Sequence, residues 1–197
     1  MDGALGIIAL ILLPLFAAIH HNPYGIISGI IMGVSMIILY TMSSIYHGLS
    51  PNLKAKKVFQ IFDHCAIFLL IAGTYTPFCL CTLRKYSTQL GWSIFAIIWA
   101  TAIFGIIINS IDIKKYKIIS MICYLLMGWC IIFKISILPS LLTKTGFYLL
   151  LAGGIVYSLG AILYILGKKK KYIHSIFHIF ILIATMLHFL CVLLYVC

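Results

Sequence analysis

Seven apolar stretches, each close to membrane-crossing length, follow one another along this chain and constrain its fold more than any other feature. An α-helix needs about 20 apolar residues to cross about 30 Å of hydrocarbon. With 64% hydrophobic and 9% charged residues, the chain has too little polar surface for a soluble domain. We therefore predict an all-α, polytopic membrane protein, with a single seven-helix transmembrane domain over residues 1–197. The predicted spans are 3–19, 25–46, 58–82, 90–110, 118–137, 146–167 and 172–196.

The breaks between these spans carry turn residues and most of the positive charge. His21-Asn22-Pro23 and Ser50-Pro51-Asn52 are two such breaks, whereas Pro77 is expected to kink the third span. The breaks after the second, fourth and sixth spans hold ten lysines, against four basic residues on the other side. By the positive-inside rule, the amino terminus is cytoplasmic. The ten are Lys54, Lys56, Lys57, Lys114, Lys115, Lys117, Lys168, Lys169, Lys170 and Lys171.

The net charge of +11 does not indicate a nucleic-acid partner. The basic residues occur in short runs between apolar spans and not in a stripe with interleaved aromatic residues. Arg84 is the single arginine among the 14 basic residues, which argues against bidentate recognition of phosphates. The charge pattern is therefore typical of loops that fix membrane topology.

Four polar residues in the apolar sequence predict a functional site. A charged side chain in the middle of a membrane helix costs about 2.5–3.5 kcal/mol on insertion scales, so such residues usually have partners or a function. His47 ends the second span, Asp63 lies near the start of the third, and His174 and His178 open the seventh. In the predicted topology all four lie at one depth, just inside the cytoplasmic face.

The types of these residues and their spacing favour a metal ion. His174 and His178 are four residues apart, so both imidazoles project from one face of a helix. Together with His47 they would supply three nitrogen ligands and leave a fourth position open, as in catalytic zinc sites. Iron, cobalt and manganese are alternatives to zinc. Asp63 could hydrogen-bond the metal-bound water or orient a ligand, and Ser43, one turn before His47, could reach the same pocket.

Simpler interpretations remain open for each of these residues. A histidine at a helix end, such as His47, can reach water at the membrane surface, and Asp63 can form a structural ion pair with a loop lysine. The His174 and His178 pair can be interfacial polar residues beside the lysine loop. Ser43 can be a helix-packing residue, and Ser44 competes with it for the proposed role.

The other histidines are expected to lie outside the site. His64 points about 100° away from Asp63 around the helix. His188 lies about 15 Å beyond His178 along the helix axis, too far to bind the same ion, and is expected to form a polar contact between helices. His20 and His21 belong to an outer loop.

At these positions the chain resembles the hemolysin III family, bacterial relatives of the progestin and adipoQ receptors. The resemblance covers nearly the whole chain and implies seven spans with the amino terminus inside. One departure is an N-x3-H element that the family usually carries before the first span. Here the chain begins at Met1-Asp2-Gly3, so either the start is truncated or that element is dispensable. The matching segments are Ser43-Ser44-Ile45-Tyr46-His47, Phe62-Asp63-His64, Gly73-Thr74-Tyr75-Thr76-Pro77 and His174-Ser175-Ile176-Phe177-His178.

The resemblance implies a zinc ion held by His47, His174 and His178, with Asp63 on the zinc water and Ser43 nearby. It also implies a multi-pass protein of the bacterial cytoplasmic membrane whose partner is a membrane lipid or fatty acid. Alkaline ceramidases belong to the wider superfamily, so the first functional expectation is zinc-dependent hydrolysis of a lipid amide or ester. The second is a lipid-sensing or homeostasis protein with a structural zinc, and the third is a haemolytic pore. The oligomeric state is left open.

Overall fold

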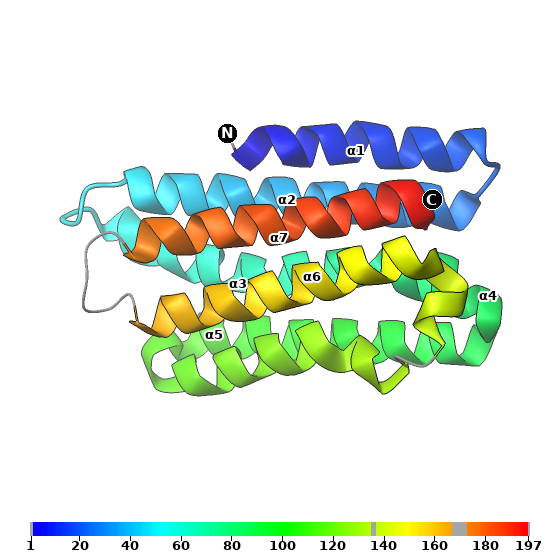
Figure 1. Cartoon of the computed structure of the whole chain (residues 1–197). Coiled ribbons are helices and arrows are strands. Elements are labelled where there is room, and N and C mark those ends of the chain that lie inside the picture. Colours follow the sequence, from blue (N-terminus) through cyan, green and yellow to red (C-terminus); the bar gives the residue numbers. More distant parts are fainter. Residues whose placement is uncertain (1, 135–136, 167–172, 197) are drawn as a thin grey trace. The chain divides into compact units, whose positions relative to one another are not determined.

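A computed structural model describes residues 2–134, 137–166 and 173–196 of the chain, and over these residues it is helical and contains no strand. The described chain forms two compact units, one ending at Met127 and the other running Gly128–Val196. The all-α prediction is confirmed, whereas the single domain over 1–197 stays a prediction. The elements are α1 (Asp2–Ile19), α2 (Pro23–Gly48), α3 (Lys54–Pro77), η1 (Phe78–Leu83), α4 (Arg84–Tyr86), α5 (Thr88–Trp129), η2 (Cys130–Lys134), α6 (Leu138–Leu166) and α7 (Ile173–Tyr195) (Figure 1).

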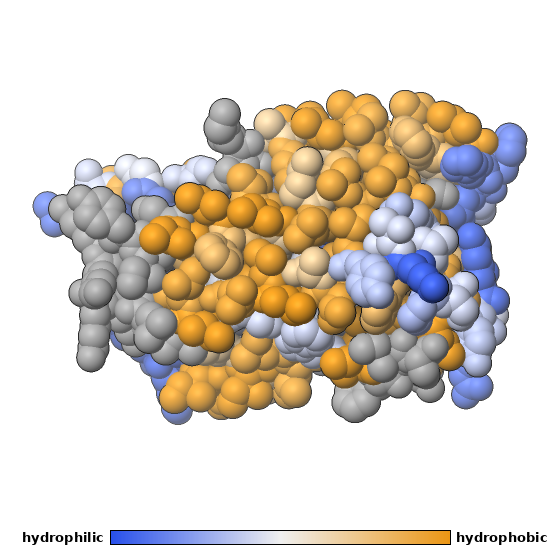
Figure 2. Space-filling model, viewed as in Figure 1, coloured by the Kyte–Doolittle hydropathy of each residue, from blue (hydrophilic) through white to orange (hydrophobic). Residues whose placement is uncertain are grey.

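Five helical stretches in the described residues are long and apolar enough to cross a membrane, and a sixth, Gly3–Ile19, is apolar but shorter. On the face shown in Figure 2, hydrophobic residues cover the middle of the helices and hydrophilic residues gather near helix ends. The multi-pass prediction therefore holds, while the number seven and the cytoplasmic amino terminus stay predictions. The five stretches are Pro23–Gly48, Lys54–Tyr86, Thr88–Ile132, Leu138–Tyr164 and Ile176–Tyr195.

The turn into α2 confirms the break expected at residues 21–23. His21 has a φ of 50°, in the left-handed region, and the Asn22 side chain accepts a hydrogen bond from the Gly25 amide at 3.1 Å. Pro23 takes the first helical position, where its missing N–H costs no intrahelical bond. The chain therefore ends α1 and begins α2 within three residues.

Glycines on α2 let α1 approach its backbone closely. Gly25, Gly29 and Gly33 recur every four residues and so lie along one side of the helix. A Cβ atom at Gly33 would stand 2.6 Å from the Leu10 Cα atom, closer than real side-chain contacts allow. Small residues at this spacing are the usual means by which membrane helices pack, because lipid offers no hydrophobic drive for helix association.

The third helix changes its hydrogen-bond register after Pro77 without ending. Phe78–Leu83 form a π-helical stretch, which runs directly into Arg84–Tyr86. The Arg84 guanidinium stacks over the Tyr24 ring at 3.5 Å, so the start of α2 is attached to the end of this stretch. The structure thus shows a π-helical stretch directly after Pro77, and the kink expected at Pro77 stays a prediction.

The long element α5 folds back on itself at Asp112. Asp112 has an extended backbone conformation, and its carboxylate accepts hydrogen bonds from the amides of Lys114 and Lys115, as an N-cap residue does. Asn109 and Ser120 would be about 16 Å apart in a continuous helix. Their side chains instead form a hydrogen bond of 2.5 Å, so the two halves run side by side (Figure 1). The break predicted between residues 110 and 118 is confirmed.

In the second unit, α6 and α7 pack through a mixture of small and polar residues. Thr143, with a φ of 62°, separates the first residues of α6 from its long remainder. The hydroxyls of Tyr157 and Thr185 are hydrogen-bonded at 2.5 Å. His188 lies against Gly153, with its Nε2 atom 3.1 Å from the Leu150 carbonyl oxygen. His188 is therefore a contact between helices, as predicted.

Candidate functional site

The packing of α2 against α3 brings His47 and Asp63 to the same level. Gly73 lies directly against the Ser35 side chain, and farther along, Ser28 Oγ is 3.5 Å from Cys81 Sγ. These two contacts define an antiparallel register. Asp63 precedes Gly73 by ten residues. In this antiparallel register it therefore lies opposite residue 45, which follows Ser35 by ten residues. His47 is then offset by about 3 Å along the helix axis at 1.5 Å per residue. The predicted depth match of these two residues holds within the first unit.

The surroundings of the two residues differ. Asp63 is buried, whereas His47 is exposed, with its ring edge-on to the Tyr46 ring at a centroid distance of 4.6 Å. The Asp63 carboxylate interacts electrostatically with Tyr46, as the register requires. Lys56 donates a hydrogen bond to the Leu49 carbonyl oxygen at 2.6 Å and lies over the Tyr46 ring. Lys56 thus closes the connection between α2 and α3 beside the site.

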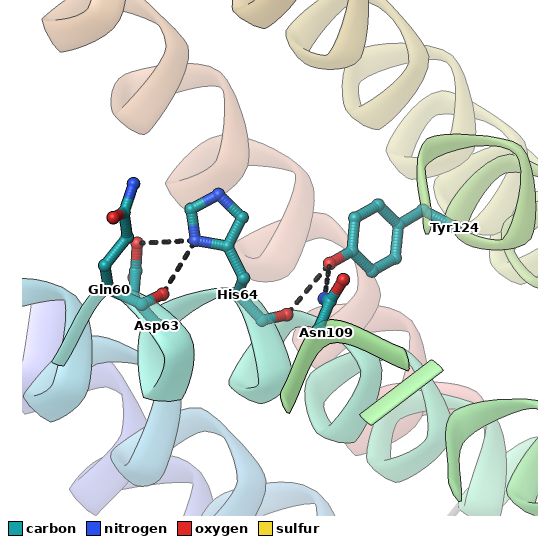
Figure 3. A network of polar contacts seen from close by, with 5 residues as sticks. All are labelled: Gln60, Asp63, His64, Asn109 and Tyr124. Atoms are coloured by element: carbon teal, nitrogen blue, oxygen red, sulfur yellow. Dashed lines mark hydrogen bonds and ion pairs between the residues drawn. The ribbon is translucent and has the colours of Figure 1, made fainter. Parts of the chain in front are cut away.

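The expectation that His64 lies apart from Asp63 is wrong. His64 Nδ1 is 4.0 Å from Asp63 Oδ2 and 2.8 Å from the Gln60 carbonyl oxygen (Figure 3). Adjacent residues on a helix do leave the backbone about 100° apart. The imidazole is nevertheless long enough to turn back along the helix toward the carboxylate. His64 therefore belongs to the polar cluster around Asp63.

A polar network that includes the buried residues Asn109 and Ser120 continues from His64 into α5. The Tyr124 hydroxyl donates to the His64 carbonyl oxygen at 2.8 Å, and the Asn109 Nδ2 atom donates to the Tyr124 hydroxyl at 3.3 Å (Figure 3). Ser120 completes the network through its bond to Asn109 Oδ1. Asn109 is 1% exposed, an unusual place for an amide in a membrane helix. None of these three residues, Tyr124, Asn109 and Ser120, was predicted from the sequence, although an asparagine inside an apolar span was the available signal.

The remaining predicted ligands lie at the start of α7, in the second unit. Both His174 and His178 fall within this helix, one turn apart, as the spacing predicts. The His178 ring is half-buried and packs edge-on against the Phe177 ring at 5.2 Å, and Phe177 in turn contacts Tyr164 of α6. The side chain of His174 lies outside the described residues. The approach of this pair to His47 and Asp63 stays a prediction.

Within each unit, the described side chains include only some of the residues that are predicted to bind a metal ion. No group of three His, Cys, Asp or Glu side chains close enough to hold a metal ion is found among the described residues. The first unit offers the imidazole of His47 and the carboxylate of Asp63 at one level, and the second offers His178. Imidazole nitrogen with carboxylate oxygen is a donor set that suits zinc. The residues present fit the expected ion in chemical type.

The two serines on α2 differ in their exposure. Ser43 is half-buried, whereas Ser44 is exposed. Ser43 is one turn from His47 and therefore lies on the same side of the helix. Of the two candidates, Ser43 is the one whose surroundings agree with a place beside His47, and its chemical role stays a prediction.

Comparisons with known proteins agree with the resemblance seen in the motifs. The family model described as "Haemolysin-III related" matches residues 3–189. The chain is 46% identical to "Hemolysin-3" of Bacillus cereus over 196 residues, which is 100% of this chain and 87% of that protein. It is 41% identical to the "Hemolysin-3 homolog" of Bacillus subtilis (strain 168) over 191 residues, 97% of this chain and 87% of the relative.

A more distant similarity extends to animals. The human "Monocyte to macrophage differentiation factor" is 26% identical over 164 residues, which cover 81% of this chain and 66% of the human protein. No solved structure matches the chain at a significant level.

Proposed function

Because the chain belongs to the haemolysin-III-related family of integral membrane proteins, we propose that it is a zinc-dependent hydrolase of lipid amide or ester bonds. The proposed zinc ligands are His47, His174 and His178. The observation that carries the proposal is the α2–α3 register, which brings a buried carboxylate, Asp63, to the level of His47. A buried carboxylate in a membrane protein is usually functional.

The proposed topology has seven crossings, with the amino terminus in the cytoplasm. The fold-back at Asp112 supports two crossings within α5, because the 45-residue stretch Thr88–Ile132 is about twice the length that one crossing needs. The α1 helix supplies the first crossing. The lysines near Asp112 and those at the start of α3 then face the cytoplasm, where positive residues accumulate. The bacterial relatives are consistent with a place in the bacterial cytoplasmic membrane.

The proposed chemistry divides between the side chains of the cluster. When bound, zinc supplies Lewis-acid activation of a carbonyl group and lowers the pKa of a water molecule. Asp63 accepts the proton of the attacking water and returns it to the leaving amine nitrogen or alkoxide oxygen as the bond from that atom to the carbonyl carbon breaks. Its burial keeps competing bulk water away from the carboxylate. The Ser43 hydroxyl donates a hydrogen bond to the substrate carbonyl oxygen as negative charge develops there. His64 lies next to this carboxylate, with its Nδ1 atom 4.0 Å from Asp63 Oδ2.

Hydrolysis of defined lipids tests this proposal directly. Purified protein in phospholipid vesicles is given a short-chain ceramide and a matched ester, and the release of fatty acid is followed by mass spectrometry. We expect release from the wild-type protein and a loss of at least about 100-fold in Asp63→Asn, since a positioned base contributes about 10²–10⁴-fold. Ser44→Ala is the matched control, because this serine is exposed. No release from a broad lipid panel would contradict the enzymatic proposal.

The names of the bacterial relatives, "Hemolysin-3" and "Hemolysin-3 homolog", favour a second candidate function, membrane lysis. Leakage of a dye from vesicles that carry the protein separates the two functions. Leakage that persists in Asp63→Asn and His47→Ala would support a pore independent of the proposed site. Leakage that disappears with zinc removal would follow from lipid hydrolysis.

A further inference from the structure

A hydroxyl from α5 reaches the backbone of α3 at the residue next to Asp63. The Tyr124 hydroxyl donates to the His64 carbonyl oxygen at 2.8 Å, across 60 positions of sequence. This carbonyl lies inside α3 and not at its end, so the bond adds to the regular ladder of the helix. The Tyr124 ring also packs against Phe68, one turn farther on, at a centroid distance of 4.3 Å. Tyr124 therefore contacts the Asp63 segment at two points.

Hydrogen bonds within α5 fix the orientation of the Tyr124 hydroxyl. Asn109 donates to the tyrosine hydroxyl at 3.3 Å and accepts a bond from Ser120 at 2.5 Å. Asn109 and Ser120 are 1% and 4% exposed. Gly105 lies directly against the end of the Phe68 ring, since any Cβ there would overlap the ring. All of these residues belong to the first unit, in which the α5 fold-back brings them together.

We propose that Tyr124, oriented by Asn109, is a positioning residue that fixes the Asp63–His64 segment of α3. It acts through the His64 carbonyl oxygen. The connection from that carbonyl to the cluster is short, because the His64 ring lies 4.0 Å from the Asp63 carboxylate. The functional consequence rests on the proposed zinc site. Mutation of outer-shell groups, which orient the residues around a metal ion, typically lowers metal affinity or activity about 10- to 100-fold.

The conservative variant Tyr124→Phe removes the hydroxyl and keeps the ring that packs on Phe68. In the full-length protein we expect about one zinc per chain at saturation and a zinc affinity about tenfold weaker, measured by competition with a chelator. Tyr157→Phe is the matched control, because it removes a similar hydroxyl bond from the second unit, to Thr185 at 2.5 Å. An unchanged affinity in Tyr124→Phe would overturn the proposal.

A double-mutant cycle separates positioning from general stability. If Tyr124 acts on zinc through the Asp63–His64 segment, its effect on affinity disappears in an Asp63→Ala background, since residues that share one network are not additive. Equal losses of affinity in the two backgrounds would show that Tyr124 acts elsewhere, and would overturn the proposal.

Amide hydrogen exchange tests the positioning role of Tyr124 without depending on zinc. In metal-free protein, backbone amides of residues 60–68 should exchange several-fold faster in Tyr124→Phe than in the wild type, and Tyr157→Phe should leave them unchanged. Unchanged exchange in Tyr124→Phe overturns the positioning role. If the wild type binds no zinc but exchange in this segment still responds, the zinc function fails while the positioning of α3 stands.

Discussion

The Asn109 side chain and the Ser120 hydroxyl form a hydrogen bond of 2.5 Å although the residues are 11 positions apart in one helical element. The bond is possible because α5 reverses direction at Asp112. It joins the two halves of α5 and, through Tyr124, connects both to α3. A single buried amide therefore links three helical segments beside the proposed site.

Replacing Asn109 by leucine should destabilise the protein. The change removes two hydrogen bonds and leaves the buried Ser120 hydroxyl and the half-buried Tyr124 hydroxyl with one partner fewer each. We expect the free energy of unfolding to fall by about 1–3 kcal/mol, measured by denaturation in detergent micelles. Ser110→Ala is the control, since Ser110 is exposed and donates to the Ile106 carbonyl of its own helix. Its effect should stay within about 0.5 kcal/mol.

Replacing Gly33 by alanine should separate α1 from α2. The added Cβ would stand 2.6 Å from the Leu10 Cα atom, and a backbone atom cannot move aside as a flexible side chain can. We expect a loss of about 1–3 kcal/mol in stability, as for other overpacked cores. Gly128→Ala is the control, because nothing lies within 4 Å of a Cβ there. Equal stability of the two variants would contradict the observed packing.

His188 should prove to be a packing residue and not a zinc ligand. A Cβ at Gly153 would overlap the His188 ring, so Gly153→Ala should lower the melting temperature. Adding His188→Ala should recover part of this loss, because the overlap disappears. Zinc content should be unchanged in His188→Ala. A loss of zinc in His188→Ala would show instead that the zinc site includes the middle of α7.

The topology can be tested with peptide tags inserted into single connections. A tag after Lys115 and a tag after Lys54 should both be reached by antibody in inside-out vesicles, because both positions lie among the lysines assigned to the cytoplasm. A tag after Lys85 should be reached in right-side-out vesicles. Tags after Lys85 and Lys115 that are reached from the same side of the membrane would refute the assignment of α5 to two crossings.

The helices and their breaks could be predicted from the sequence because apolar length and turn chemistry are local properties. The breaks at residues 21–23 and 50–52 and the one that contains Asp112 all lie where expected. The π-helical stretch after Pro77 could not be predicted, since its hydrogen-bond register depends on close packing, such as that of Gly91 against the Cys79 carbonyl.

The candidate site could be predicted only in part, for a similar reason. The similar depths of His47 and Asp63 in the membrane follow from the predicted topology alone. The bond from Tyr124 to the His64 backbone spans 60 positions and depends on how α5 folds back. Likewise, the direction of the His64 ring is a choice of side-chain rotamer, which the angle between adjacent residues on a helix does not determine.

The X-ray absorption spectrum of the purified protein at the zinc edge tests the proposed zinc site directly. We expect about one zinc per chain, with a first shell that includes three imidazole nitrogens at about 2.0–2.1 Å and a loss of zinc in His47→Ala and in the His174→Ala/His178→Ala double variant. Retention of zinc in these variants, or sulfur neighbours at about 2.3 Å from the chain's cysteines, would contradict it.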